Sequence, residues 1–209
     1  MNRIITVSRE FGSGGRELGK RLAEELGIAY YDREIVTAIA QHAELAEEYV
    51  GQILENRIQT YYPITIASSF AAMPPADTMH YVNRSIYAAQ NEIIEKLGRE
   101  SDCVIVGRCA DYILEEQHPF DLFVYADMPS KMARCRAKGG EHSQMTDKEL
   151  QKNIQAIDKA RAQYYRFYTG KVWGDRYNYD LCINTSNLDL KEAAKAVAEV
   201  VKCHFNSGK

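Results

Sequence analysis

The stretch that decides the fold is residues 4–19, IITVSREFGSGGRELG. It opens with apolar, mostly β-branched residues, which predict a buried strand. A glycine cluster follows, and then Leu18, Leu22 and Leu26 recur at the spacing of one helix face. A strand, a glycine loop and a helix N-terminus together form an anion site, because backbone N–H groups and the helix dipole both favour a negative ligand.

The glycine loop matches the phosphate-loop consensus G-x-x-x-x-G-K-S/T only in part. When Gly15-Arg16-Glu17 is aligned with its last three residues, Glu10 stands where the first glycine belongs. Arg16 then replaces the lysine, and Glu17 replaces the hydroxyl residue that holds magnesium. The alternative is a tight strand-to-helix turn that needs glycine only for positive φ. The position of the loop directly after a strand favours phosphate binding.

The composition is that of an ordinary globular domain. The chain has 209 residues, 45% of them apolar and 26% charged, with a net charge of −3. This charge argues against a general nucleic-acid-binding surface, and no run approaches the ~20 apolar residues of a membrane span. With no signal-peptide pattern at the start, we expect a cytoplasmic protein with small-molecule partners, and neither nucleic acid nor membrane among them.

The cysteines predict reduced thiols. They are widely spaced, odd in number and without a Cys-x-x-Cys pair: Cys103, Cys109, Cys135, Cys182 and Cys203. Such usage is typical of a reducing compartment. No histidine joins a cysteine at the spacing of a zinc site, so we expect no structural zinc.

Strand and helix patterns alternate along the chain. Apolar runs predict further strands at residues 28–31, 102–108, 121–126 and 179–184. Helical periodicity predicts helices at residues 17–26, 33–50, 81–97, 145–168 and 188–205, with another after residue 127. Gly27 and Gly98 are expected to end helices, whereas prolines make residues 58–80 irregular. The order predicts an α/β fold of three layers, α/β/α, with a mainly parallel sheet.

Charged residues lie at the ends of two of these strands. Asp32 comes directly after one, and Arg108 ends another. Residues at and just past the carboxyl ends of parallel strands line the ligand crevice of open α/β sheets. Asp32 could instead be only an N-cap, and Arg108 only a surface salt bridge. Asp158 and Arg161 lie three residues apart on a predicted helix, where a plain intrahelical ion pair is the alternative.

Together these segments resemble the nucleoside monophosphate kinases, and most closely the cytidylate kinase-like family. The resemblance rests on segments in the same order and with similar spacing across nearly the whole chain. They are SREFGSGGR at 8–16, YYD at 30–32, VGR at 106–108, AIDKAR at 156–161 and NYDLCINTS at 178–186. It implies a P-loop kinase fold in one domain, residues 1–209, with a helical acceptor-binding insert at about 33–80 and a helical lid at about 139–175.

The resemblance also implies an activity and its cofactors. It implies ATP-dependent phosphoryl transfer, with Mg2+, to a nucleoside monophosphate, CMP being the first guess. The donor phosphates would be bound by the glycine loop, namely Gly12, Ser13, Gly14, Gly15, Arg16 and Glu17. Arg136 would lie near the donor adenine, and Glu17 could ligate the metal, whose ligands are otherwise unknown.

On the acceptor side, the resemblance places Tyr31 and Asp32 near the acceptor nucleotide. Arg108 would grip the acceptor phosphate, Asp158 would meet the acceptor sugar, and Arg161 would neutralise the transferred phosphoryl group. With Arg16, the last three form the expected catalytic set.

The departures from the family pattern leave other readings open. Lysine and a hydroxyl residue are replaced by Arg16 and Glu17, and Ile154 stands where the lid has its first arginine. A nucleotide-binding sensor with reduced catalysis is one alternative. A P-loop kinase for a small molecule that is not a nucleotide is another. The oligomeric state is not indicated by the sequence.

Overall fold

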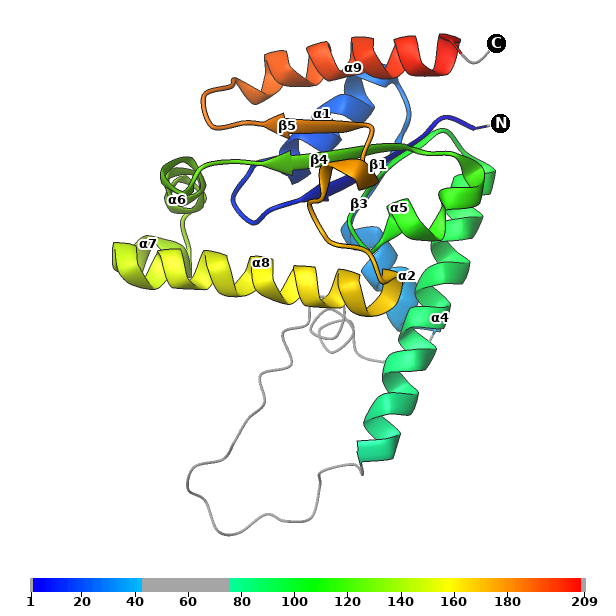
Figure 1. The fold of residues 1–209 in the computed structure, drawn as a ribbon, viewed down its shortest axis with the longest axis horizontal. Coiled ribbons are helices and arrows are strands. Elements are labelled where there is room, and N and C mark those ends of the chain that lie inside the picture. Colours follow the sequence, from blue (N-terminus) through cyan, green and yellow to red (C-terminus); the bar gives the residue numbers. More distant parts are fainter. Residues whose placement is uncertain (1, 43–75, 208–209) are drawn as a thin grey trace.

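The computed structural model describes residues 2–42 and 76–207 (Figure 1). Its centre is a five-stranded sheet with the order β2-β3-β1-β4-β5, in which every neighbouring pair is parallel. The strands are β1 (Ile4–Arg9), β2 (Ala29–Tyr31), β3 (Cys103–Val106), β4 (Phe120–Tyr125) and β5 (Leu181–Asn184). The predicted parallel α/β sheet is confirmed.

Helices cover both faces of the sheet (Figure 1). The helices are α1 (Gly15–Leu26), α2 (Arg33–His42), α4 (Ala76–Glu100), α5 (Ala110–Ile113), α6 (Met128–Ala137), α7 (Glu141–Gln144), α8 (Asp147–Thr169) and α9 (Leu190–Ser207). Helices α1 and α9 pack on one face, in a core that joins Val7 to Leu18. Helices α2, α4 and α5 pack on the other, in a core that joins Ile105 to Ile94. The three predicted layers are therefore present.

Two helix signals in the sequence are confirmed. Gly27 ends α1 in the left-handed region at φ 64°, where glycine adds no steric strain. Thr146 and Glu149 form a capping box at the start of α8, so each satisfies a backbone N–H of the first turn.

The expected helix end at Gly98 is wrong, because α4 continues to Glu100. A Cβ atom at position 98 would lie 3.0 Å from Leu114 Cδ2 and 3.2 Å from Ile4 Cδ1. Glycine therefore serves close packing of α4 against β1 and the end of α5 rather than termination. The expected irregular stretch 58–80 is also corrected, since α4 already begins at Ala76.

Part of the predicted organisation lies outside the described residues. This holds for positions 43–75, and so for most of the expected acceptor-side subregion at 33–80. Among the helices that the structure does describe, none combines the length and the apolar character needed to cross a bilayer.

Candidate functional site

The loop between β1 and α1 has the backbone shape of an anion site. Gly12 and Gly14 have φ of 76° and 84°, and Gly14 is the N-cap of α1. The buried Ser13 hydroxyl donates a hydrogen bond of 2.8 Å to the carbonyl of Glu10, which closes the turn. The first N–H groups of a helix have no intrahelical acceptor. The loop therefore presents the open end of α1 to an anion.

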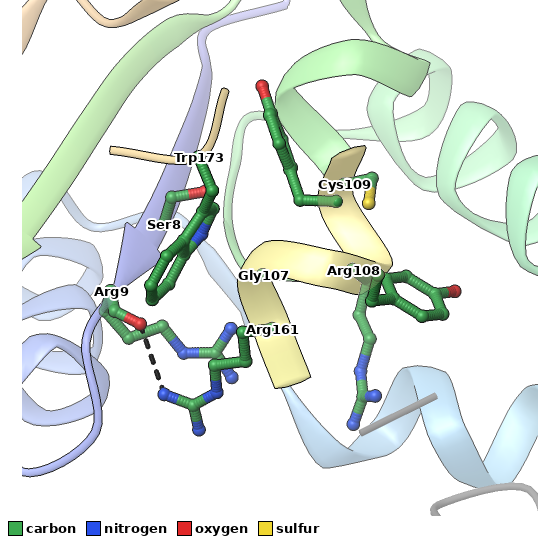
Figure 2. Close-up of a pocket in the computed structure, with 9 residues that line it drawn as sticks. Ser8, Arg9, Gly107, Arg108, Cys109, Arg161 and Trp173 are labelled. Carbon is green, nitrogen blue, oxygen red and sulfur yellow. Dashed lines mark hydrogen bonds between the residues drawn. The ribbon is translucent and has the colours of Figure 1, made fainter. Parts of the chain in front are cut away.

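Two cavities meet beside this loop. A wide, open cleft lies over the loop, and its lining includes Gly12, Gly14, Gly15, Arg16, Arg134 and Lys138. A smaller and narrower cavity is lined by Ser8, Arg108, Tyr164, Tyr165 and Trp173, among others. Arg9 and Arg161 line both cavities, and Figure 2 shows these two side chains beside Gly107. The two arginines thus stand where a group passing from one cavity to the other would travel.

The turn after β3 holds Arg108 at the smaller cavity. Gly107, Arg108 and Cys109 have φ of 76°, 62° and 55°, three consecutive residues in the left-handed region. The buried Gln90 side chain donates 3.0 Å to the carbonyl of Arg108 and accepts 3.3 Å from the Tyr164 hydroxyl. Such backbone strain persists only where surrounding contacts fix it, and it is concentrated at functional sites.

Arg9 is a functional candidate that the sequence interpretation missed. Its carbonyl accepts 3.1 Å from Nη1 of Arg161. Burial lowers the pKa of Arg9 to about 9, and the nearby charges of Arg161 and Arg108 act in the same direction, against the carboxylate of Asp32. Its position at the carboxyl end of β1, close in the sheet to that of Arg108 after β3, is the signal that could have identified it.

Arg16 and Asp32, expected on the donor and acceptor sides respectively, lie together. The Nε atom of Arg16 is 2.6 Å from Oδ2 of Asp32, whose side chain is only 7% exposed. Arg16 lines the wide cleft, whereas Asp32 is not among the residues that line either cavity. Asp32 therefore serves as a buried counter-charge for the arginines of the site.

Glu17, the one candidate metal ligand, is paired along its own helix. Its Oε1 lies 2.8 Å from Nη2 of Arg21, and Glu17 does not line the wide cleft. Among the described residues there is no group of three or more His, Cys, Asp or Glu side chains that could hold a metal ion. The Glu17 carboxylate thus does not fit a Mg2+ ligand in this arrangement.

Lys131 on α6 joins two acidic groups beside the loop. Its Nζ lies 2.6 Å from Glu10 Oε2 and 2.9 Å from Asp158 Oδ2, and its side chain is 6% exposed. The Asp158 carboxylate also accepts 2.6 Å from the amide of Phe11. Asp158 thus ties α8 to the phosphate loop, and it does not line the smaller cavity. The sequence showed Lys131 only as part of a basic helix face.

Three further positions have local packing roles. Arg136 donates to the carbonyl of Met145 at 3.1 Å, and the Tyr31 hydroxyl lies 3.4 Å from Ser101 Oγ. Neither Arg136 nor Tyr31 lines either of the two cavities described above. Ile154, which stands in place of an arginine, is fully buried in the core between α6 and α8.

Cations gather around both cavities, and those of the wide cleft lie close to the loop. Arg134 reaches the loop from α6, where its Nη1 donates 3.3 Å to the carbonyl of Ser13. Arg16 and Lys138 line the same cleft. Preorganised cations and backbone N–H groups of this kind bind phosphate groups and stabilise the charge of a transferred phosphoryl group.

Known structures share this fold. An uncharacterized protein from Eubacterium ventriosum ATCC 27560 is 25% identical, with a TM-score of 0.66 over 96% of this chain and 99% of that one. A shikimate kinase from Bacteroides thetaiotaomicron is 15% identical, with a TM-score of 0.58 over 96% and 98%. The shikimate kinase from Acinetobacter baumannii in complex with shikimate is 14% identical, with a TM-score of 0.54 over 98% and 95%. At these identities the two kinases show the fold alone.

A family model supplies the relationship that these structures do not. No curated protein matches the chain. The model described as the cytidylate kinase-like family matches residues 4–187, which include every strand of the sheet and both cavities. The chain therefore belongs to the cytidylate kinase-like family.

Proposed function

We propose that the protein transfers the γ-phosphoryl group of ATP to an acceptor that already carries a phosphate, a nucleoside monophosphate with CMP as the first candidate. The family and the P-loop kinase fold support a phosphotransferase. The chemistry of the smaller cavity is the observation that carries the acceptor class.

That cavity combines cations with aromatic rings. Arg9, Arg108 and Arg161 line it, as do the side chains of Tyr164 and Trp173. Arginines bind phosphate through charge-assisted hydrogen bonds, and aromatic rings offer a stacking surface to a planar base. The combination suits a ligand with a phosphate at one end and a base at the other.

The lining also bears on the identity of the attacking oxygen. Among the described residues that line the smaller cavity there is no Asp, Glu or His. An alcohol acceptor gives up a proton and commonly needs a general base. A phosphate oxygen is already ionised near neutral pH and needs none. The cavity therefore favours a phosphate over a hydroxyl as the nucleophile.

The proposed reaction has a simple balance. An acceptor phosphate oxygen forms a bond to the γ-phosphorus, the bond from that phosphorus to the β–γ bridging oxygen breaks, and ADP leaves. The electron pair stays on ADP. Arg161 lines both cavities. There it would bind the equatorial oxygens of the phosphoryl group during its transfer.

Mg2+ would enter with ATP, bound by phosphate oxygens and water, as is usual at kinase sites. It would supply charge neutralisation for the donor phosphates. The arginines of the wide cleft and the N-terminus of α1 would add to the neutralisation of the phosphate charge.

A second reading, a nucleotide-binding protein with reduced turnover, is favoured by one observation. The two residues that depart from the consensus are both engaged in intramolecular ion pairs, Arg16 with Asp32 and Glu17 with Arg21. A loop committed to such pairs could bind nucleotide without catalysis.

Coupled ADP release separates these readings. ATP and Mg2+ are supplied with CMP, dCMP, UMP, AMP or GMP in separate reactions, with shikimate as a hydroxyl acceptor and with no acceptor. We expect turnover with at least one monophosphate, and its loss in Arg161→Met but not in Arg21→Met, an exposed control. Measurable ATP binding without turnover would favour the sensor, and turnover with shikimate alone would overturn the acceptor class.

A further inference from the structure

The first residue of α1 fixes how the phosphate loop aligns with the consensus sequence. In the consensus, the cation follows directly after the last glycine of the loop, where the helix begins. Here Gly14 is the N-cap at φ 84°, and α1 begins at the next residue, Gly15. Counted from this helix start, position 15 corresponds to the consensus lysine and position 9 to the first glycine. This register is one residue earlier than the one that places Arg16 at the lysine.

Positions 9 and 15, which correspond to the first glycine and the lysine of the consensus in this alignment, lie side by side. A Cβ atom at Gly15 would lie 2.5 Å from Cβ and 3.1 Å from Cγ of Arg9. Gly15 does not need its glycine for backbone conformation, because its φ is not in the left-handed region. The missing side chain therefore makes room for the Arg9 side chain, which leaves β1 directly beside it.

The far end of Arg9 is accommodated by a second glycine. A Cβ atom at Gly107 would collide with Nη1 of Arg9 and lie 2.8 Å from its Cζ. The Arg9 side chain thus runs from Gly15 at the phosphate loop to Gly107 at the turn that carries Arg108. Figure 2 shows the guanidinium of Arg9 between the end of β1 and this turn.

The guanidinium lies among like charges. Arg161, Arg108 and Arg16 are the cations that act on it, and Asp32 is the carboxylate that opposes them. Within residues 2–42 and 76–207, no acidic side chain forms an ion pair with Arg9. Asp32 is paired with Arg16 and Asp158 lies 3.9 Å from Arg161. A further anion bound beside Arg9, at the junction of the two cavities, would be stabilised by the charge of these arginines.

We propose that Arg9 is the phosphate-binding cation of this loop, and that it and Gly15 have exchanged the positions that glycine and lysine occupy in the consensus. The cation comes from the end of β1 instead of the start of α1 and reaches the same place over the helix N-terminus. Because Arg9 lines both cavities, it would contact the phosphoryl group on both sides of the transfer. Its part in turnover rests on the proposed function, whereas its part in binding polyphosphate does not.

The first test separates binding from turnover. Arg9→Met keeps the aliphatic stem and removes the charge, Arg9→Lys restores a charge without the planar fork, and Arg21→Met on the exposed side of α1 is the control. Binding is measured by thermal shift with inorganic tripolyphosphate and with ATP. We expect the stabilisation by either ligand to be lost in Arg9→Met, kept in part in Arg9→Lys and intact in Arg21→Met.

The melting temperature without ligand distinguishes binding from a structural role. Removing one of several crowded cations should leave it unchanged or raise it, whereas loss of a structural contact should lower it. If the wild type turns over, kcat should fall in Arg9→Met by at least about 100-fold, the scale of losing a transition-state cation.

The second test rebuilds the consensus. Arg9→Gly removes the closest contact of a side chain at position 15 and leaves Val124 Cβ at 3.1 Å. Gly15→Lys then supplies the lysine there. We expect Arg9→Gly alone to lose tripolyphosphate binding and the double variant Arg9→Gly/Gly15→Lys to regain at least about tenfold in affinity, the equivalent of ~1.4 kcal/mol.

The outcomes are distinct. Wild-type binding of tripolyphosphate that survives Arg9→Met overturns the inference, whether or not any acceptor is turned over. Binding that depends on Arg9 without turnover of any acceptor supports the inference and overturns the proposed function. No recovery in a double variant that melts like Arg9→Gly would contradict the exchange of positions.

Discussion

Nζ of Lys131 lies 2.9 Å from the carboxylate of Asp158, so that a lysine on α6 joins the long helix α8 to the phosphate loop. The same ammonium contacts Glu10 at 2.6 Å. Three chain segments thus meet at one buried cation. The site is therefore held in register by a charge network, in addition to the apolar core between α6 and α8.

The first prediction concerns this network. In Lys131→Met the carboxylates of Glu10 and Asp158 lose their shared cation and repel each other. We expect the free energy of unfolding to fall by about 1–3 kcal/mol, the scale for a buried charged partner left unsatisfied. Urea unfolding measures it. Lys195→Met, which removes an exposed pair with Glu192, is the control and should change stability by less than about 1 kcal/mol. Equal losses in both would contradict the account.

The second prediction is that substitution of Arg108 weakens acceptor binding without lowering the stability of the fold. Asn tolerates the left-handed conformation that Arg108 adopts at φ 62°. Arg108→Asn should therefore leave the free energy of unfolding unchanged or raise it by up to about 1 kcal/mol. It should raise the KM of the acceptor by about tenfold or more, since a charge-assisted hydrogen bond to a phosphate contributes roughly 1.5–3 kcal/mol. The Kd of ATP should stay constant, and an equal loss for both ligands would place Arg108 elsewhere.

The third prediction is a pH dependence that arises inside the sheet. Asp121 on β4 pairs with Thr6 on β1, whose hydroxyl donates to it. Burial raises the pKa of Asp121 from 3.8 to about 8, with Asp111 and Asp180 adding to the shift. Between these two values the folded state binds more protons than the unfolded chain, so the free energy of unfolding falls as the pH rises.

Asp121→Asn should flatten that dependence. From about pH 5 to about pH 8 the wild type should lose at least ~1 kcal/mol more than the variant, because each pKa unit corresponds to about 1.4 kcal/mol. Urea midpoints across this range measure the difference. Identical pH profiles for the two proteins would show that Asp121 ionises normally in the fold.

Glu17 gives a fourth prediction. Its carboxylate pairs with Arg21, so Glu17→Gln should leave the Mg2+ concentration for half-maximal activity within about threefold, as at an exposed surface position. A titration of activity against free Mg2+ measures it. A large rightward shift in the variant, with normal ATP affinity, would return Glu17 to the role of metal ligand.

The sequence predicted the architecture well because local signals and burial agree along most of the chain. The alternation of apolar strands and amphipathic helices matches the parallel sheet and its two helical layers, and the capping box at Thr146 marks the start of α8. The prediction for Gly98 was wrong because the sequence does not distinguish a glycine required by tertiary packing from one that ends a helix.

The candidate site was predicted less completely, since its pairings connect distant segments. Arg16 and Asp32 were placed on opposite sides of the site, yet they form one ion pair. In the sequence Lys131 is one of several basic residues on a helix, and its burial depends on a contact with Asp158 of the distant helix α8. Arg9 was not predicted because the consensus places the cation after the glycines. The course of its side chain is seen only from the packing of Gly15 and Gly107 against it.

The most direct test of the account is the phosphorus NMR spectrum of a reaction that contains the protein, ATP, Mg2+ and CMP. If the protein transfers the phosphoryl group to CMP, the γ-phosphate signal of ATP decreases while the two diphosphate signals of CDP grow beside those of ADP, without inorganic phosphate. A panel of the other monophosphates identifies the preferred base. Release of inorganic phosphate alone, or transfer only to a hydroxyl acceptor to give a phosphate monoester signal, would contradict the claim that the acceptor oxygen belongs to a phosphate.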